Sequence, residues 1–229
     1  MPSKITPVLI FILMAAALLT QPMPFIPVTG GEAAAAAKGT PELSEFIAGV
    51  KNGQPDQLVG IYAAGALAQP IVQQPATDSA FVSTQPGEVT QFGLASNYGT
   101  IGLLAHNYLA GADFFELTAG QMIILVYGDG RLAYYQVQSV QQYQALQPKS
   151  PYSDYINLQT GQQLTTADTF AQIYQPGGRV VLQTCIAANG EDSWGRLFVV
   201  AVPITPPTPI EMVRYGSSMV MAGLSALNF

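Results

Sequence analysis

The feature that most constrains the fold is a succession of short β-prone runs, separated by turn residues, that extends from Leu58 to Ile204. The runs are rich in Val, Ile, Leu, Tyr and Phe, and Gly, Pro, Asn and Asp stand between them. The 22 glycines and 17 prolines of the chain fit many tight turns. Many short strands with little helix predict an all-β domain, either a barrel or a sandwich.

The clearest local signal is a hairpin, in which Gly128-Asp129-Gly130 separates two β-prone runs. Pro70 interrupts another run and predicts an edge or irregular strand there. The complete set of predicted strands is 58–62, 68–72, 80–83, 100–106, 121–127, 131–140, 179–186 and 194–204. Short helices are expected at 41–50 and 166–172, with a helical turn near 118–120.

A long mixed segment, residues 141–178, separates two of the predicted strands. It contains four tyrosines and the sequence Pro148-Lys149-Ser150-Pro151. Long segments between strands are usually functional, and such a segment often forms a wall over a binding cleft.

The N-terminal segment has the pattern of an export signal. Lys4 provides a short positive region, residues 5–19 are almost wholly apolar, and the apolar character continues to Val28. Small residues at 33–37 offer cleavage sites. We therefore expect an extracytoplasmic protein, either secreted or membrane-anchored through residues 5–28. The predicted organisation is a signal or anchor plus linker at 1–38, a helical lead-in at 39–57, a β-barrel domain at 58–205 and an amphipathic tail at 206–229.

Composition excludes several functions. Charged residues make up only 10% of the chain, the formal net charge is −6, and the eight Lys and Arg are scattered, so no basic patch is present to bind nucleic acid. The single cysteine excludes an intramolecular disulfide framework and a cysteine cluster for zinc or an iron–sulfur centre. Neither a metal nor an organic cofactor is expected.

Three residues are candidates for chemistry: Cys185, the only cysteine; His106, the only histidine; and Arg196, eleven residues after the cysteine. A thiolate is a strong nucleophile toward an amide carbonyl, a histidine can act as acid and base, and an arginine can stabilise an oxyanion. If the runs around Cys185 and Arg196 pair as a hairpin, both side chains can lie on one face. The alternatives are a small buried thiol, a hydrogen-bonded strand-end histidine and a solvated surface arginine.

Several blocks together resemble the sortases, the cysteine transpeptidases of bacterial surfaces. The resemblance covers Leu58 to Ile204, and its blocks are 102–106 with 114–123, 126–137, 181–185 and 196–201. The block Val181-Leu182-Gln183-Thr184-Cys185 is similar to the family's Thr-Leu-x-Thr-Cys motif. Departures are Ala105-His106-Asn107 around the histidine, Gln183, Gln121 and the length of 141–178, and they leave the subclass and the preferred sorting signal open.

The resemblance implies a closed eight-stranded β-barrel with a few short helices. It gives Cys185 the place of the nucleophile, His106 that of the general acid and base, and Arg196 that of the clamp for the oxyanion or substrate. Thr184 takes the place of the motif threonine beside the nucleophile, with a substrate-binding role. The implied partners are a protein carrying a C-terminal sorting signal and an amine acceptor at the cell surface, or water.

Two other classes of function are alternative hypotheses. A catalytically silent sortase-fold domain would bind or scaffold at the cell surface and would not need a reactive Cys185. A papain-like peptidase would have its cysteine before its histidine and at the start of a helix. Here His106 precedes Cys185, which ends a strand-like run, so this class is disfavoured.

Overall fold

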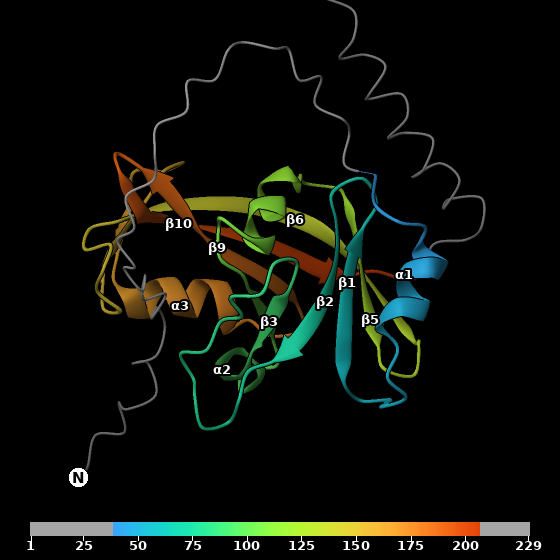
Figure 1. Cartoon of the computed structure of the whole chain (residues 1–229). Helices are drawn as coiled ribbons and strands as arrows, with labels where there is room; N and C mark the ends of the chain where they lie inside the picture. Colours follow the sequence, from blue (N-terminus) through green and yellow to red (C-terminus); the bar gives the residue numbers. More distant parts are fainter. Residues whose placement is uncertain (1–38, 207–229) are drawn as a thin grey trace, which may run out of the picture.

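The central feature of the fold is a closed barrel of eight strands, seen in a computed structural model that describes residues 39–206 (Figure 1). The strands follow one another around the barrel in the order β10-β9-β4-β3-β2-β1-β5-β6, and a pairing of β6 with β10 closes it. Their bounds are β1 Leu58–Ala63, β2 Leu67–Gln73, β3 Val89–Phe92, β4 Ile101–Leu104, β5 Met122–Tyr127, β6 Leu132–Ala145, β9 Val180–Ala188 and β10 Glu191–Pro203. The predicted all-β closed barrel of eight strands is confirmed.

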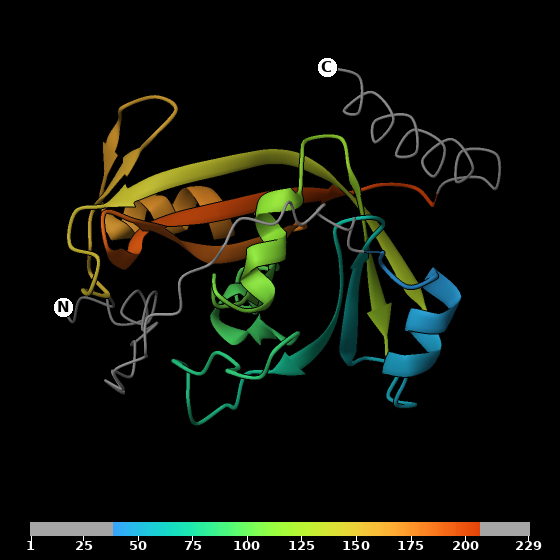
Figure 2. The same ribbon diagram turned by 45° about the horizontal axis from the view of Figure 1, so that its top comes forward.

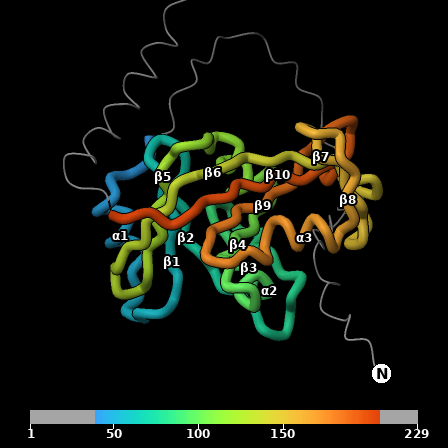
Figure 3. The backbone as a smooth tube through the Cα atoms, turned by 180° about the vertical axis from the view of Figure 1, so that it is seen from behind, coloured from blue at the N-terminus to red at the C-terminus, as the bar shows by residue number. Residues whose placement is uncertain are grey.

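Four short helices and a small hairpin are added to this barrel. The helices are α1 Leu43–Val50, α2 Gly93–Ser96, the 3-10 helix η2 Ala110–Glu116 and α3 Thr166–Tyr174. Strands β7 Tyr155–Asn157 and β8 Gln163–Leu164 form the hairpin, which extends the sheet from the far end of β6. Seen from behind, β6, β10 and β9 run side by side, with β7, β8 and α3 gathered at one end of the three strands (Figure 3).

Alternation along the strands divides the apolar residues between the inside and the outside of the barrel. The inner core includes Leu182 of β9 and Val199 of β10, together with Ile61, Leu103 and Leu125. Helix η2 lies between β9 and β2 and adds Ala110 and Phe114 to the same core (Figure 2). The barrel is therefore a packed core rather than a channel.

The outer wall formed by β9 and β10 is also buried. Val181, Phe198 and Val200 pack there against Phe170 and Tyr174 of α3. The helix is fixed to β9 by a hydrogen bond of 2.7 Å from the Tyr174 hydroxyl to Gln183 Oε1. Gln183, which replaces an apolar residue of the sortase motif, is thus a buried polar contact between the helix and the strand.

A third cluster lies on the other side of the barrel, where α1 covers β1 and β5 (Figure 1). Phe46 packs there against Val59, Tyr62 and Val126. The ring centroids of Tyr62 and Phe46 are 5.7 Å apart. The Tyr62 hydroxyl donates to the Pro41 carbonyl at 3.1 Å. The predicted helix at 41–50 is confirmed, and it packs directly on the barrel.

The strand predicted at 80–83 is wrong, and the strand β3 was not predicted. Residues 80–83 are irregular, and the Ser83 N–H donates to Thr90 Oγ1 of β3 at 2.8 Å. The four residues of β3 are less apolar than residues 80–83, but β2 and β4 flank them and supply hydrogen-bond partners on both sides. Position between two strands therefore outweighs local propensity here.

Pro70 predicts an edge or irregular strand, and the first of these alternatives is wrong, because β2 lies inside the sheet between β1 and β3. Pro70 is opposite Gly60 of β1, and the pairing of β2 with β3 begins only at Ile71. The proline therefore stands just before the ladder on that side, where its missing N–H costs no hydrogen bond.

Other sequence predictions have mixed outcomes. The hairpin around Gly128-Asp129-Gly130 is confirmed, and its second arm, β6, extends to Ala145. The predicted helix at 166–172 is confirmed as α3, which begins after Thr165, whose hydroxyl accepts a hydrogen bond from the Asp168 N–H. The signal or anchor at 1–38 and most of the tail at 206–229 lie outside the described residues. Within residues 39–206, no helix has the length and apolarity needed to cross a membrane.

Candidate active site

Cys185 and Arg196 lie directly opposite each other in the antiparallel ladder of β9 and β10. Directly opposite residues of an antiparallel pair project from the same face of the sheet, with Cβ atoms about 5 Å apart. Arg196 is in alternation with Phe198 and Val200, which belong to the outer cluster under α3. The two candidate side chains are therefore neighbours on the outer wall of the barrel.

His106 reaches the same region through the parallel pairing of β4 with β9. The ladder ends where Leu104 is opposite Gln183, and the Ala105 N–H continues it with a bond of 3.3 Å to the Gln183 carbonyl. Two residues after Leu104, the same register brings His106 level with Cys185. The three residues selected from the sequence thus lie in one row: His106 just after the end of β4, Cys185 within β9, which continues to Ala188, and Arg196 within β10.

The backbone after β4 is held by several contacts that fix the position of His106. Its carbonyl accepts hydrogen bonds of 3.0 Å from the N–H groups of Leu109 and Gly111. Asn107 Nδ2 donates to the Asp192 carbonyl at 3.1 Å, which ties this segment to the β9–β10 hairpin. Asn107, a departure from the usual sortase sequence, therefore links the histidine segment to the strand pair that carries the cysteine and arginine.

The His106 ring is nearly buried beneath an exposed aromatic side chain. It stacks on Tyr108 with ring centroids 5.2 Å apart and an interplanar angle of 25°, and Tyr108 is 67% exposed. Burial lowers the pKa of His106 below the usual value, and a hydrogen bond with the Val82 backbone acts in the opposite direction. The imidazole is consequently neutral at pH 7 in this structure.

Arg196 is a buried cation, with 1% of its surface exposed. Its Nη1 donates to the carbonyls of Ser193 at 2.9 Å and Gly195 at 2.8 Å. Among the described residues, its Nε has no hydrogen-bond partner, although the atom is buried. A buried donor without an acceptor costs free energy. The Nε hydrogen is therefore an unused donor on a residue that lies opposite Cys185.

Cys185 is likewise enclosed, with 3% of its surface exposed. Burial raises the pKa of the Cys185 thiol; the Arg196 guanidinium lowers it, and Asp192 and Glu191 raise it further. The raised pKa keeps the sulfur protonated at neutral pH. A reaction at Cys185 therefore needs a base to accept the thiol proton, and His106 is the neutral base in the same row.

Thr184 points to the inside of the barrel, away from the outer wall. It is fully buried, and its hydroxyl donates to the Ala105 carbonyl at 2.9 Å, directly before His106. This contact couples the strand of Cys185 to the histidine segment. A substrate-binding role for Thr184 stays a prediction.

Sequence reasoning missed Tyr155, which the structure adds to this site. It lies opposite Ala145 in the β6–β7 ladder and packs on the outer wall beside Tyr143, which is itself opposite Arg196. Burial raises the pKa of the Tyr155 hydroxyl, Arg196 lowers it and Cys185 raises it. The four tyrosines of 141–178 are visible in the sequence. A three-residue strand gives no periodicity that would assign one of them to the site.

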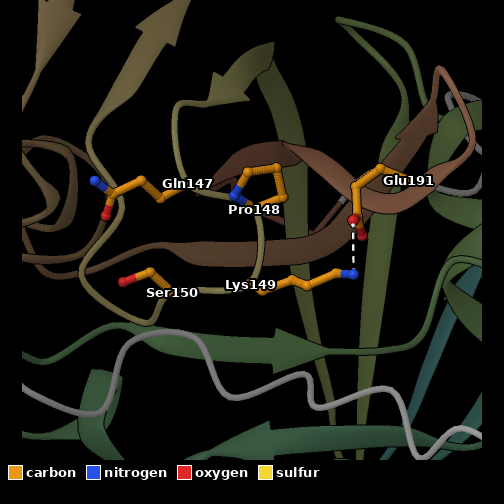
Figure 4. A pocket seen from close by; sticks show the side chains of 5 residues that line it. All are labelled: Gln147, Pro148, Lys149, Ser150 and Glu191. Atoms are coloured by element: carbon orange, nitrogen blue, oxygen red, sulfur yellow. Dashed lines mark ion pairs between the residues drawn. The ribbon is translucent and has the colours of Figure 1, made fainter.

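An open depression of about 550 Å³ lies beside the β9–β10 turn (Figure 4). It is lined by Glu191 at the start of β10 and by the loop residues Gln147, Pro148, Lys149 and Ser150. Lys149 Nζ and Glu191 Oε2 form an ion pair of 3.4 Å across it, and the Lys149 side chain is 81% exposed. The predicted wall segment 141–178 therefore reaches the β9–β10 hairpin, while its β7 and α3 cover the outer wall.

Comparison with solved structures returns sortases of the A and C classes. Sortase A from Corynebacterium diphtheriae is 12% identical, with a TM-score of 0.45 over 67% of this chain and 63% of that chain. Sortase A from Listeria monocytogenes is 14% identical, with a TM-score of 0.40 over 70% of this chain and 97% of that chain. Sortase C-1 from Actinomyces oris is 15% identical, with a TM-score of 0.42 over 75% of this chain and 85% of that chain. The match thus spans less than two thirds of the C. diphtheriae chain.

No family model matches the sequence, and no curated protein sequence is similar to it.

Proposed function

We propose that this protein is a sortase-like cysteine transpeptidase. The observation that carries the proposal is the β9–β10 register, which sets the only cysteine of the chain opposite a buried arginine. The end of β4, with the only histidine, joins the same row through the parallel pairing with β9. The resemblance of the sequence blocks to sortase motifs supports the same residues independently of this pairing.

In the proposed reaction, Cys185 Sγ attacks a backbone carbonyl in a C-terminal sorting signal, and His106 accepts the thiol proton. The C–N bond breaks as His106 returns that proton to the leaving amine, which leaves a thioester on Cys185. An amine at the cell surface then attacks the thioester and gives its proton to His106, the C–S bond breaks, and His106 passes that proton to the departing sulfur to restore the thiol. Water in place of the amine would make the reaction a hydrolysis.

Arg196 has an electrostatic role in this scheme. Its charge is permanent at working pH, so it is no base, but it favours negative charge on the neighbouring sulfur and on an oxyanion formed there. The Arg196 guanidinium already lowers the pKa of the Cys185 thiol against the effect of burial.

The proposed location is outside the cytoplasm, with residues 1–38 as the export signal or anchor. Both the sorting signal and the acceptor amine would be found there.

The test uses the purified full-length chain in detergent with a panel of sorting-signal peptides and amines. We expect cleavage, a peptide–amine product, and an acyl adduct on Cys185 by mass spectrometry. Cys185→Ala should abolish all three. Intact peptides and an unmodified Cys185 across the whole panel would contradict the proposal.

A second candidate is a catalytically silent sortase-fold binding or scaffold domain at the cell surface. The observation in its favour is enclosure: Cys185 is 3% exposed and Arg196 1%. The scaffold candidate predicts that Cys185→Ala leaves the biological role of the protein unchanged. The transpeptidase proposal predicts that the same substitution abolishes that role.

A further inference from the structure

Two buried hydrogen-bond donors on the outer wall that carries Cys185 have no acceptor. Within residues 39–206 only four buried side-chain polar atoms lack a hydrogen-bond partner, and two of them are Tyr155 Oη and Arg196 Nε. Tyr155 is fully buried and Arg196 is 1% exposed. A buried polar atom without a hydrogen-bond partner costs free energy, so two unsatisfied donors on one face of the sheet need an explanation.

The two donors belong to one face of the sheet. Arg196 is opposite Cys185 on one side and opposite Tyr143 on the other, and Tyr143 is in alternation with Ala145, the partner of Tyr155. The pKa of Tyr155, which burial raises, is also lowered by Arg196 and raised by Cys185, in agreement with this placement. The sulfur, the guanidinium and the phenol thus share one enclosed patch.

The nearby tyrosine Tyr143 provides a contrast. Its ring meets that of Tyr155 edge to face at 6.4 Å, but its hydroxyl donates to Gln141 Oε1 at 2.8 Å. Two tyrosines on the same face therefore differ in one respect: one hydroxyl is used by the fold and the other is not.

From this arrangement we infer that Tyr155 Oη and Arg196 Nε form a two-donor site for the oxygen of a carbonyl group that Cys185 attacks. As the S–C bond forms, the C=O π bond breaks and negative charge moves to that oxygen. The Tyr155 O–H and the Arg196 Nε–H then donate to it, and the folded protein loses no existing hydrogen bond when they do so. Tyr155 is the new member of the site, and its assignment rests on the proposed attack by Cys185.

The phenol is suited to donate rather than to lose its proton. Burial raises the pKa of Tyr155 to about 12, with Arg196 lowering it and Cys185 raising it. Tyr155 consequently keeps its proton throughout the range in which a transpeptidase would act.

The experiment compares two reagents on the full-length chain and on Tyr155→Phe. A peptide aldehyde adds to Cys185 to give a hemithioacetal: the S–C bond forms and the thiol proton passes to the former carbonyl oxygen. Iodoacetamide alkylates the same sulfur, releases iodide and creates no such oxygen. We expect Tyr155→Phe to weaken aldehyde binding about tenfold or more, because one hydrogen bond to the oxygen is lost, and to leave the alkylation rate within about twofold.

Thermal unfolding separates this role from a structural one. Tyr155→Phe removes a hydroxyl that has no partner, so Tm should stay equal or rise. Tyr143→Phe, the matched control, breaks the bond to Gln141 and should lower Tm while keeping the aldehyde affinity. Equal aldehyde affinity in wild type and Tyr155→Phe would overturn the inference. So would a wild-type protein that is alkylated but binds no aldehyde, or a Tyr155→Phe effect of equal size on both reagents.

The outcome is separable from that of the proposed function. Loss of aldehyde affinity in Tyr155→Phe, together with no cleavage of any sorting peptide, would reject the transpeptidase and retain the donor site. If the wild type transfers peptides, and wild type and Tyr155→Phe bind the aldehyde with equal affinity, the transpeptidase is retained and the donor site is rejected.

Discussion

At the residue scale, the site combines groups whose burial opposes their charged forms. Burial raises the pKa of the Cys185 thiol and lowers the pKa of the His106 imidazole. At neutral pH both are uncharged, and one proton is shared by the pair. Attack by the sulfur requires this singly protonated pair, in which the proton can move from thiol to imidazole.

The pH dependence of activity follows from the lowered pKa of His106 and the raised pKa of Cys185. In acid, activity should fall when the His106 imidazole becomes protonated, which happens below its usual pKa of 6.5. In base, activity should fall when the Cys185–His106 pair loses its one titratable proton, which happens above the usual thiol pKa of 9.0. We expect a broad plateau of kcat/KM between the two limbs. Glu191→Gln removes a charge that raises the pKa of the thiol, so it should move the basic limb to lower pH. A narrow optimum between 6.5 and 9.0 would contradict the assignment of the pair.

The Arg196 guanidinium should not be replaceable by an ammonium group. Arg196→Lys keeps a positive charge but removes the Nε donor and the fork that binds the carbonyls of Ser193 and Gly195. We expect kcat/KM to fall about 100-fold or more. Arg131→Lys, at an exposed arginine paired with Asp129, is the matched control and should leave kcat/KM unchanged. Similar activity in both variants would show that charge alone suffices at position 196.

At the element scale, η2 fixes the histidine segment through a close approach at Gly111. A Cβ on this residue would collide with Thr184 Oγ1 and would lie 2.7 Å from the carbonyl oxygens of Ala105 and His106. We expect Gly111→Ala to cost about 1–3 kcal/mol of stability. It should also lower kcat/KM, because the backbone that the new Cβ displaces is that of Ala105 and His106. Denaturant unfolding and the peptide assay measure the two effects.

Gly49 of α1 is the control for this prediction, since a Cβ there meets nothing within 4 Å. Gly49→Ala should raise stability by about 0.5–1 kcal/mol through its helix propensity. If Gly111→Ala is as stable as Gly49→Ala, the packing of η2 does not constrain the histidine segment.

The elements that could be predicted from the sequence are those with strong local signals. The Gly128-Asp129-Gly130 turn gave the β5–β6 hairpin, and the spacing of Cys185 and Arg196 made a shared face feasible. Strand β3 depends on its neighbours for hydrogen bonds, and Tyr155 lies in a strand too short to show a period. The parallel β4–β9 pairing joins distant parts of the chain, so only the family resemblance related His106 to Cys185 in advance.

At the scale of the whole molecule, the outer wall is covered by segments that follow β6. Helix α3 and strand β7 pack on it, and Lys149 pairs with Glu191 at the hairpin. This covering leaves Cys185 only 3% exposed. Access of a reagent to the sulfur therefore requires part of this cover to move.

Thiol labelling measures this access. At pH 7.5 we expect iodoacetamide to modify Cys185 in the native protein at least about tenfold more slowly than in denaturant, because enclosure and a raised pKa both reduce the reactive thiolate. The unfolded chain is its own reference, since Cys185 is the only cysteine. Equal rates would mean that the wall is open in solution.

The double pairing of β10 has a consequence for when the protein becomes reactive during its synthesis. Strand β10 hydrogen bonds to both β6 and β9, so the ring of strands stays open until this strand has been made and docked. Arg196 belongs to that strand, whereas His106 and Cys185 precede it in the chain. A nascent chain consequently carries its thiol without the guanidinium opposite. Docking of a strand across such long sequence separations is a slow folding step, and it sets the moment at which the constellation first exists.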